Sequence, residues 1–192
     1  MALLITGLIL FLGTHLLRVF ADDWRSQMRE RWGENGWKAV YSGVSLGAFV
    51  LLVWGYSLAR QSPVVLWSPP AGLRHLAAPF TWLAFVLLAA AYVPRNHFKA
   101  RIHHPMVAGT KLWAFAHLLA NGTLHDALLF GSFLAWAVLL FAASRRRDRK
   151  LRTVYAAGTP TGTLMAVVLG TGAWALFAFW LHGLWIGVRP FG

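Results

Sequence analysis

The sequence contains no cysteine, which excludes disulfides, thiolate metal sites and cysteine nucleophiles. Charged residues are also scarce: they make up 12% of the 192 residues, which is about half the share in an ordinary soluble domain. Hydrophobic residues make up 58% and gather in runs long enough to cross a hydrocarbon layer, which takes about 20 helical residues. These features exclude a soluble core and predict an integral membrane protein embedded in a lipid bilayer.

Acidic residues are the rarest charged type, with six Asp and Glu against 18 Lys and Arg. All six fall in connections or at the ends of apolar runs, which argues against a carboxylate relay or cation site deep in the membrane. The net charge of +12 does not indicate nucleic-acid binding, because the basic residues lie between apolar runs and form no aromatic-interleaved basic face.

The apolar runs predict an all-α, polytopic transmembrane helix bundle of about six spans, forming a single membrane domain over residues 1–192. The first run has no basic n-region and no cleavage pattern, so we interpret it as a retained helix. The weakest run, 105–120, is short for a span, and an interfacial position is the alternative. The predicted spans cover residues 2–20, 39–59, 76–94, 105–120, 126–143 and 162–188.

The basic residues are distributed unevenly over the predicted connections. Four follow the first span, four follow the third and six follow the fifth, whereas the alternate connections and the C-terminal end hold only Arg60, Arg74 and Arg189. Lys and Arg in short connections mark the cytoplasmic side. This alternation needs six crossings and predicts a bacterial inner-membrane protein with both termini in the periplasm.

Small residues in the second predicted span offer a place for close helix packing. Gly43 and Gly47 form a small-xxx-small pair that would let another helix approach. The alternative is that they are incidental glycines in a glycine-rich chain.

Histidines are the residues within the spans that carry coordination chemistry. His15 lies inside the first span with Arg18 on the same helical face, and His117 lies in the fourth span beside small residues. Two neutral imidazoles from facing helices match the axial ligation of a haem b in an apolar bundle. A zinc or di-iron site fits less well, because such sites use three or four convergent ligands that usually include carboxylates.

A structural role for both histidines remains open, with each imidazole bonded to a backbone carbonyl or a serine across a helix interface. The depths of the two residues also differ, since His15 is predicted about 8 Å and His117 about 12 to 18 Å from the cytoplasmic edge. Arg18, Arg101 or Lys111 would pair with the haem propionates. His104, with His103 before it, would contact propionates, lipid headgroups or a substrate at the entrance to the fourth helix.

Four segments resemble the NnrU family of bacterial membrane proteins over residues 1 to about 145. They are Phe11-Leu-Gly-Thr-His15-Leu-Leu-Arg18, Trp37-Lys-Ala-Val-Tyr-Ser-Gly-Val-Ser45, Val53-Trp-Gly-Tyr56 and the run from Arg101 to Gly122. The family is associated with nitrite and nitric oxide reductase systems of denitrifying bacteria. The resemblance therefore implies a membrane protein connected with nitrogen-oxide respiration.

The plant 15-cis-zeta-carotene isomerases are relatives of this family and resemble the chain in the motifs around His15 and His117. They are haem b enzymes, so the resemblance implies that these two histidines are haem iron ligands. The plant motif has a cysteine three residues before the second histidine, where this chain has Ala114. Chemistry that needs a thiolate ligand is therefore not implied here.

Three functions follow as hypotheses. In the first, the haem protein is a redox, sensing or assembly factor that works with nitrite or nitric oxide reductase components. In the second, it is a haem-dependent cis-trans isomerase of a lipophilic polyene or isoprenoid. In the third, it is a cofactor-free scaffold or, from the short match Arg101-Ile-His-His104-Pro105, an S-adenosylmethionine-dependent membrane methyltransferase.

Overall fold

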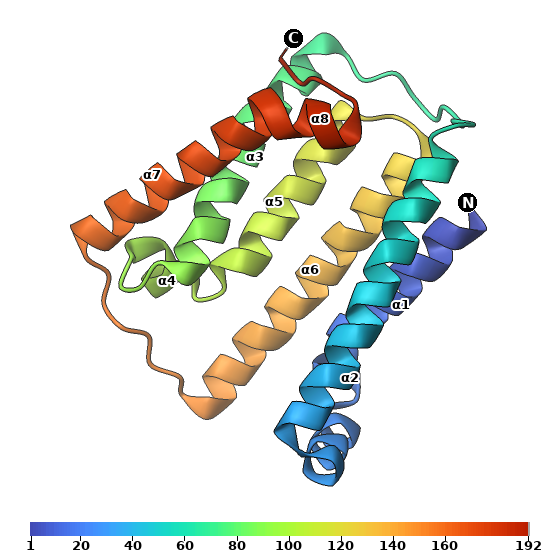
Figure 1. Ribbon diagram of the computed structural model, residues 1–192. Coiled ribbons are helices and arrows are strands. Elements are labelled where there is room, and N and C mark those ends of the chain that lie inside the picture. The colour runs from blue at the N-terminus through green and yellow to red at the C-terminus, as the bar shows by residue number, and fades with distance from the viewer. Residues whose placement is uncertain (192) are drawn as a thin grey trace.

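The computed structural model describes residues 1–191 as a bundle of helices joined by short connections (Figure 1). Within that range the only β-structure is two isolated bridges, Val65 with Thr123 and Asn96 with Thr159, so the predicted all-α class is confirmed. The helices are α1 (Ala2–Phe20), α2 (Asp22–Ala59), α3 (Ala71–Tyr92), α4 (His97–Ile102), α5 (Pro105–Ala120), α6 (Leu124–Leu151), α7 (Pro160–Leu176), the π-helical η1 (Phe177–Leu181) and α8 (His182–Ile186).

Five helical stretches are long and apolar enough to cross a membrane: α1, α2, α3, α6 and the run from α7 through α8. Helix α5 has 16 residues, so it is about 24 Å long against about 30 Å of hydrocarbon. It packs against α3 and α6 and runs beside them in the bundle (Figure 1). The chain is therefore a polytopic membrane protein.

The bundle has two chemically different ends. The turn between α1 and α2, the short helix α4 and the connection between α6 and α7 lie at one end, and both chain termini lie at the other (Figure 1). The end that holds the α1–α2 turn, α4 and the α6–α7 connection is called the basic end, because it carries the three groups of Lys and Arg identified in the sequence. The other is called the terminal end.

Two helices extend beyond their apolar runs. Helix α2 begins at Asp22 rather than at residue 39, and α6 continues to Leu151 rather than ending at 143. The added residues are polar and basic but favour helix, and they lie at the basic end outside the apolar part of each helix. Gly33, with φ of 70°, bends α2 and separates the added segment from the membrane-crossing part.

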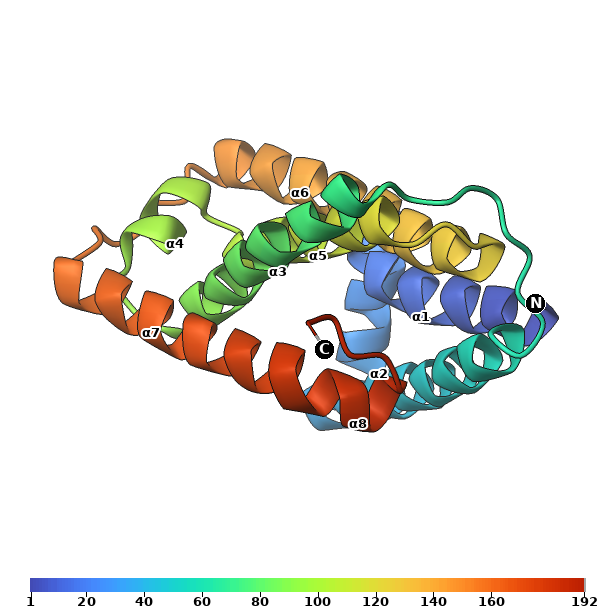
Figure 2. The same cartoon turned by 90° about the horizontal axis from the view of Figure 1, so that it is seen from above.

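The helices pack in an open order: α2 on α1, α1 on α6, α6 on α5, α5 on α3, and α3 on α7. The two outer helices of this order, α2 and α7, have no close backbone contact with each other in the described chain. Seen from above, α8 lies between them at the terminal end (Figure 2). There the guanidinium of Arg60 donates a 2.7 Å hydrogen bond to the carbonyl of Ile186.

Helices α1 and α2 form a tight antiparallel pair through two glycines. A Cβ on Gly7 would lie 2.6 Å from the Leu52 Cα, and a Cβ on Gly55 would overlap the backbone of Leu4. A Cβ on Gly43 or Gly47 would meet open space in the described chain, so no other helix of the chain packs closely on this pair, as the alternative interpretation expected. The α1–α2 interface uses the other end of α2, where Leu4, Leu8, Leu12 and Leu52 join the buried core.

Candidate functional site

His15 lies on α1 with one ring nitrogen already bonded within its own helix. Its Nδ1 is 2.7 Å from the carbonyl oxygen of Phe11, one turn earlier. Because a carbonyl only accepts hydrogen bonds, Nδ1 carries a proton, and in the neutral imidazole Nε2 then keeps its lone pair. No hydrogen bond to Nε2 is formed within residues 1–191.

His117 on α5 repeats this arrangement. Its Nδ1 is 2.8 Å from the carbonyl oxygen of Trp113, so its Nε2 is also the unprotonated nitrogen. Histidines that bind metals commonly donate one ring N–H to a carbonyl, which fixes the ring and the tautomer. The alternative was a purely structural role, in which each imidazole bonds to a group across a helix interface. The observed bonds instead go to carbonyls of the histidine's own helix, and within residues 1–191 the second ring nitrogen forms no hydrogen bond.

The two histidines border one aromatic cluster, formed by Phe11, Trp113, Phe130, Phe133 and Trp136. His15 contacts Phe11 and Trp136, with ring centroids 4.4 and 6.3 Å away. His117 stacks on Phe130 at 4.5 Å and lies 5.1 Å from Trp113. Phe133 joins the two sides through Phe11, Trp113 and Trp136.

The structure brings the two imidazoles to the same cluster without direct contact between their rings. Their neighbours on α6, Phe130 and Trp136, are six residues apart, which corresponds to about 9 Å along the helix. The depth difference expected from the sequence is therefore present.

Two buried polar atoms at the level of His15 have no hydrogen-bond partner within residues 1–191. They are the hydroxyl of Ser45 on α2 and the indole nitrogen of Trp136 on α6. An unpaired polar group in an apolar interior costs about 1–3 kcal/mol, so such atoms mark places where a bound group would be stabilised.

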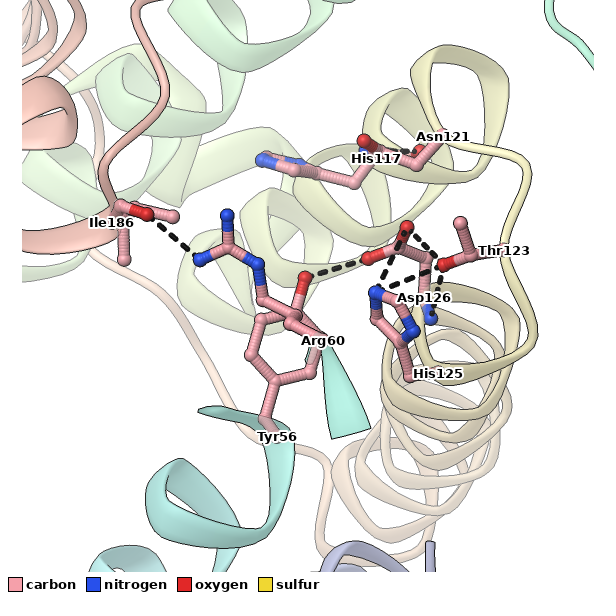
Figure 3. Close-up of polar contacts among 8 residues, drawn as sticks. All are labelled: Tyr56, Arg60, His117, Asn121, Thr123, His125, Asp126 and Ile186. Atoms are coloured by element: carbon pink, nitrogen blue, oxygen red, sulfur yellow. Dashed lines mark hydrogen bonds and ion pairs between the residues drawn. The ribbon is translucent and has the colours of Figure 1, made fainter. Parts of the chain in front are cut away.

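A polar network lies at the terminal end beside His117 (Figure 3). Asp126, only 6% exposed, accepts 2.6 Å hydrogen bonds from the hydroxyls of Tyr56 and Thr123. The Nε2 of His125 is 3.0 Å from the Thr123 hydroxyl, and its buried Nδ1 has no partner. Since the Thr123 proton goes to Asp126, His125 donates to the Thr123 hydroxyl through Nε2.

His117 extends away from this network. In Figure 3 its ring and the guanidinium of Arg60 reach toward the same side, where the backbone of Ile186 also lies. The ring of Tyr56 is below that guanidinium, with the Arg60 Cζ 6.0 Å from the ring centroid. The network thus ties α2 to α6 and holds Arg60 close to α8.

The other predicted site residues lie at the basic end. Arg18 is exposed one turn below His15. Arg101 is exposed on α4, and Lys111 places its ammonium 3.8 Å from the centre of the Phe141 ring on α6. Of the three predicted propionate partners, Arg18 is nearest to His15 along the chain.

His104 belongs to a separate cluster at the basic end. Its Nε2 donates a 2.7 Å hydrogen bond to Asp148, which also accepts one of 3.0 Å from Tyr155. His103 stacks on Tyr155 with ring centroids 4.1 Å apart and lies against the guanidinium of Arg145. Partial burial and the hydrogen bond to Asp148 raise the pKa of Tyr155. The cluster connects the start of α5 to α6 and to the α6–α7 connection.

Sequence reasoning missed Ser45, Tyr56 and Trp136, and it placed Asp126 only as a residue at a span end. Ser45 and Tyr56 are the last residues of two segments that carry the family resemblance, which was the available signal. Trp136 is one of eleven tryptophans, and nothing in its sequence context separates it from the others.

The fold and the site define a polytopic helical membrane protein with two intramembrane histidines whose Nε2 atoms are free. The chain belongs to the NnrU family, because the family model described as NnrU protein matches residues 3–190. The match extends through α7 and α8, well past the segments near which the resemblance was recognised. Neither the curated proteins nor the solved structures contain a significant match to the chain.

Proposed function

We propose that this protein holds one haem b between α1 and α5, with His15 and His117 as the axial iron ligands. The main support for the proposal is that the two imidazoles form the same hydrogen bond and have the same tautomer. In each, Nδ1 donates to the carbonyl of the residue four positions earlier and Nε2 is free. This is the tautomer that binds iron, and the hydrogen bond orients the ring for it.

The surrounding residues fit a flat, apolar macrocycle. The aromatic cluster supplies apolar contacts on the sides of both histidines, and the donors of Ser45 and Trp136 beside His15 lack partners. Bound there, haem would supply one-electron chemistry at a potential set by its ligands and by the polarity around it. Ala114, fully buried one turn before His117, offers no thiolate as an alternative ligand.

We infer that the haem protein acts as a redox, sensing or assembly factor for nitrite and nitric oxide metabolism. Membership of the NnrU family supports this role through the family's association with nitrogen-oxide respiration. In our proposal it lies in the bacterial inner membrane with both termini in the periplasm. The concentration of Lys and Arg at the basic end supports this orientation.

A second candidate function is isomerisation of a lipophilic polyene or isoprenoid. One observation favours it: within residues 1–191, α2 and α7 have no close backbone contact with each other, so the packing order does not close into a ring of helices. A substrate dissolved in the bilayer would enter between these helices and reach His117 from the membrane. A redox or assembly factor needs no such entrance.

The first test is an absorption spectrum of the detergent-purified protein, oxidised and then reduced with dithionite. We expect a sharp reduced α-band that His15→Ala and His117→Ala each abolish. His75→Ala is the matched control, because His75 is exposed near the start of α3 and should leave the spectrum unchanged. A featureless spectrum from haem-replete cells would reject the haem and favour the scaffold or methyltransferase hypotheses.

The two haem functions are separated by adding a lipophilic polyene to the reduced protein in nanodiscs. An isomerase should show a ligand-dependent spectral change and an altered cis-trans composition of the recovered polyene. A redox or assembly factor should show neither.

A further inference from the structure

Ser45 and Trp136 carry hydrogen-bonding atoms that the fold itself does not use. The Ser45 Oγ and the Trp136 Nε1 are buried, and neither makes a hydrogen bond of good geometry within residues 1–191, although the Tyr41 hydroxyl lies close to Ser45. An indole nitrogen only donates, and a serine hydroxyl can donate as well. Helix packing alone would favour an apolar side chain at either position, because an unpaired buried donor is destabilising.

Both atoms lie beside His15. The antiparallel register set by Gly7 against Leu52 and by Gly55 against Leu4 puts Ser45 level with Thr14 and His15. Trp136 approaches the His15 ring edge-on at 6.3 Å from α6. Three helices, α1, α2 and α6, therefore contribute polar side chains at the level of His15.

The level of His15 is rich in donors. Tyr41, whose ring centroid is 5.7 Å from that of His15, adds a hydroxyl, and Arg18 lies one turn below. Of the acidic side chains that follow α1, Asp22 pairs with Arg25 and also lies within electrostatic reach of Arg18, and Glu34 pairs with Lys38. The donors of Ser45, Tyr41 and Trp136 at the level of His15 match an acceptor-rich, negatively charged group on a bound ligand.

We propose that the Trp136 indole and the Ser45 hydroxyl bind the carboxylates of the tetrapyrrole, so that its propionates point toward the basic end. This inference rests on the proposed haem function and adds an orientation to it. The apolar edge of the macrocycle then faces the terminal end, and the propionates lie on the side of Arg18. Burying a carboxylate in the membrane requires such donors, because an isolated charge there is strongly destabilised.

The test compares haem b with its dimethyl ester, which has the same iron and ring but no carboxylates. Both are loaded into the purified full-length protein, and the rate of loss to excess apomyoglobin is measured. Trp136→Phe and Ser45→Ala remove one donor each. Trp180→Phe and Ser57→Ala are matched controls, because both residues are exposed and lie away from His15 on η1 and α2.

We expect the wild type to lose the ester faster than haem b. Trp136→Phe and Ser45→Ala should each speed the loss of haem b by about tenfold, the effect of one charge-assisted hydrogen bond, and should affect loss of the ester much less, because its carbonyls accept only neutral hydrogen bonds. If haem b and its ester are lost at the same rate, or if the substitutions speed both equally, the inference is wrong although the haem proposal stands. A wild type that takes up neither compound overturns both.

A carboxylate can also arrive as the head of a long-chain fatty acid. The haem-free protein is therefore titrated with oleate and with oleyl alcohol, which differ only in the head group. A preference for oleate that Trp136→Phe removes, together with equal binding of haem b and its ester, would assign the donors to a lipid and overturn the propionate assignment.

Discussion

The hydroxyl of Tyr56 donates a 2.6 Å hydrogen bond to the buried carboxylate of Asp126, which joins α2 to α6 across 70 residues of sequence. Asp126 has no Lys or Arg within salt-bridge distance in the described chain, and its charge is stabilised by hydroxyl donors and by the start of α6. The pair lies at the terminal end, where Arg60 directly follows α2.

Replacing Tyr56 by Phe should destabilise the protein, because Asp126 loses a donor and stays buried. The expected cost is about 1–3 kcal/mol, measured as a lower midpoint of thermal unfolding in detergent. Tyr92→Phe is the control, since Tyr92 is 78% exposed. Equal midpoints for the two variants would mean that the bond contributes nothing to the fold.

The apolar parts of the fold could be predicted from the sequence. The predicted spans 2–20 and 105–120 agree with α1 and α5, and the span 39–59 ends where α2 ends. The start of α2 was missed because hydropathy identifies the residues that lie in the membrane, whereas the helix itself begins in polar residues outside it. The polar residues after Asp22 continue the helical backbone outside the apolar layer until Gly33 bends it.

The candidate site could be predicted only in part. His15 and His117 stand out because an imidazole in an apolar run is costly and therefore informative. Ser45 and Trp136 are ordinary residues in such runs, and only the packing shows that their polar atoms lack partners. The role of Asp126 depends on Tyr56, a residue far away in sequence, so no local pattern could reveal it.

Gly7→Ala should weaken the α1–α2 pair, because the new methyl group would collide with the backbone of Leu52. We expect a loss of about 1–3 kcal/mol, typical of overpacking in a tight interface. Gly13→Ala in the same helix is the control. Its Cβ meets open space, and alanine favours helix, so unfolding should be unchanged or shifted upward by up to about 1 kcal/mol. Similar losses in both variants would argue against the close approach at Gly7.

Asp148→Asn should lower the raised pKa of Tyr155, because the amide cannot repel the phenolate. The phenolate absorbance is followed through an alkaline titration, and the Tyr155→Phe variant identifies the contribution of this residue. The pKa should stay above its ordinary value, since partial burial, the first cause of the shift, remains. An unchanged titration would show that Tyr155 is not bonded to Asp148.

The raised pKa of Tyr155 also affects stability at alkaline pH. A group that holds its proton more tightly in the folded state stabilises the fold below its ordinary pKa. That contribution is lost as the pH rises from the ordinary pKa through the raised one. Wild-type unfolding midpoints should therefore fall more steeply in this range than those of Tyr155→Phe, and parallel curves would contradict the prediction.

The orientation of the bundle can be tested directly because the chain has no cysteine, so each introduced thiol is the only one. Ser68→Cys lies in the α2–α3 connection at the terminal end, and Thr153→Cys lies after α6 at the basic end; both positions are exposed. In intact spheroplasts a membrane-impermeant maleimide should label Ser68→Cys and not Thr153→Cys, because basic connections stay in the cytoplasm. After permeabilisation both should react, which controls for reactivity. Labelling of Thr153→Cys alone in intact spheroplasts would invert the topology, and labelling of both would mean that the two ends of the bundle do not lie on opposite sides of the membrane.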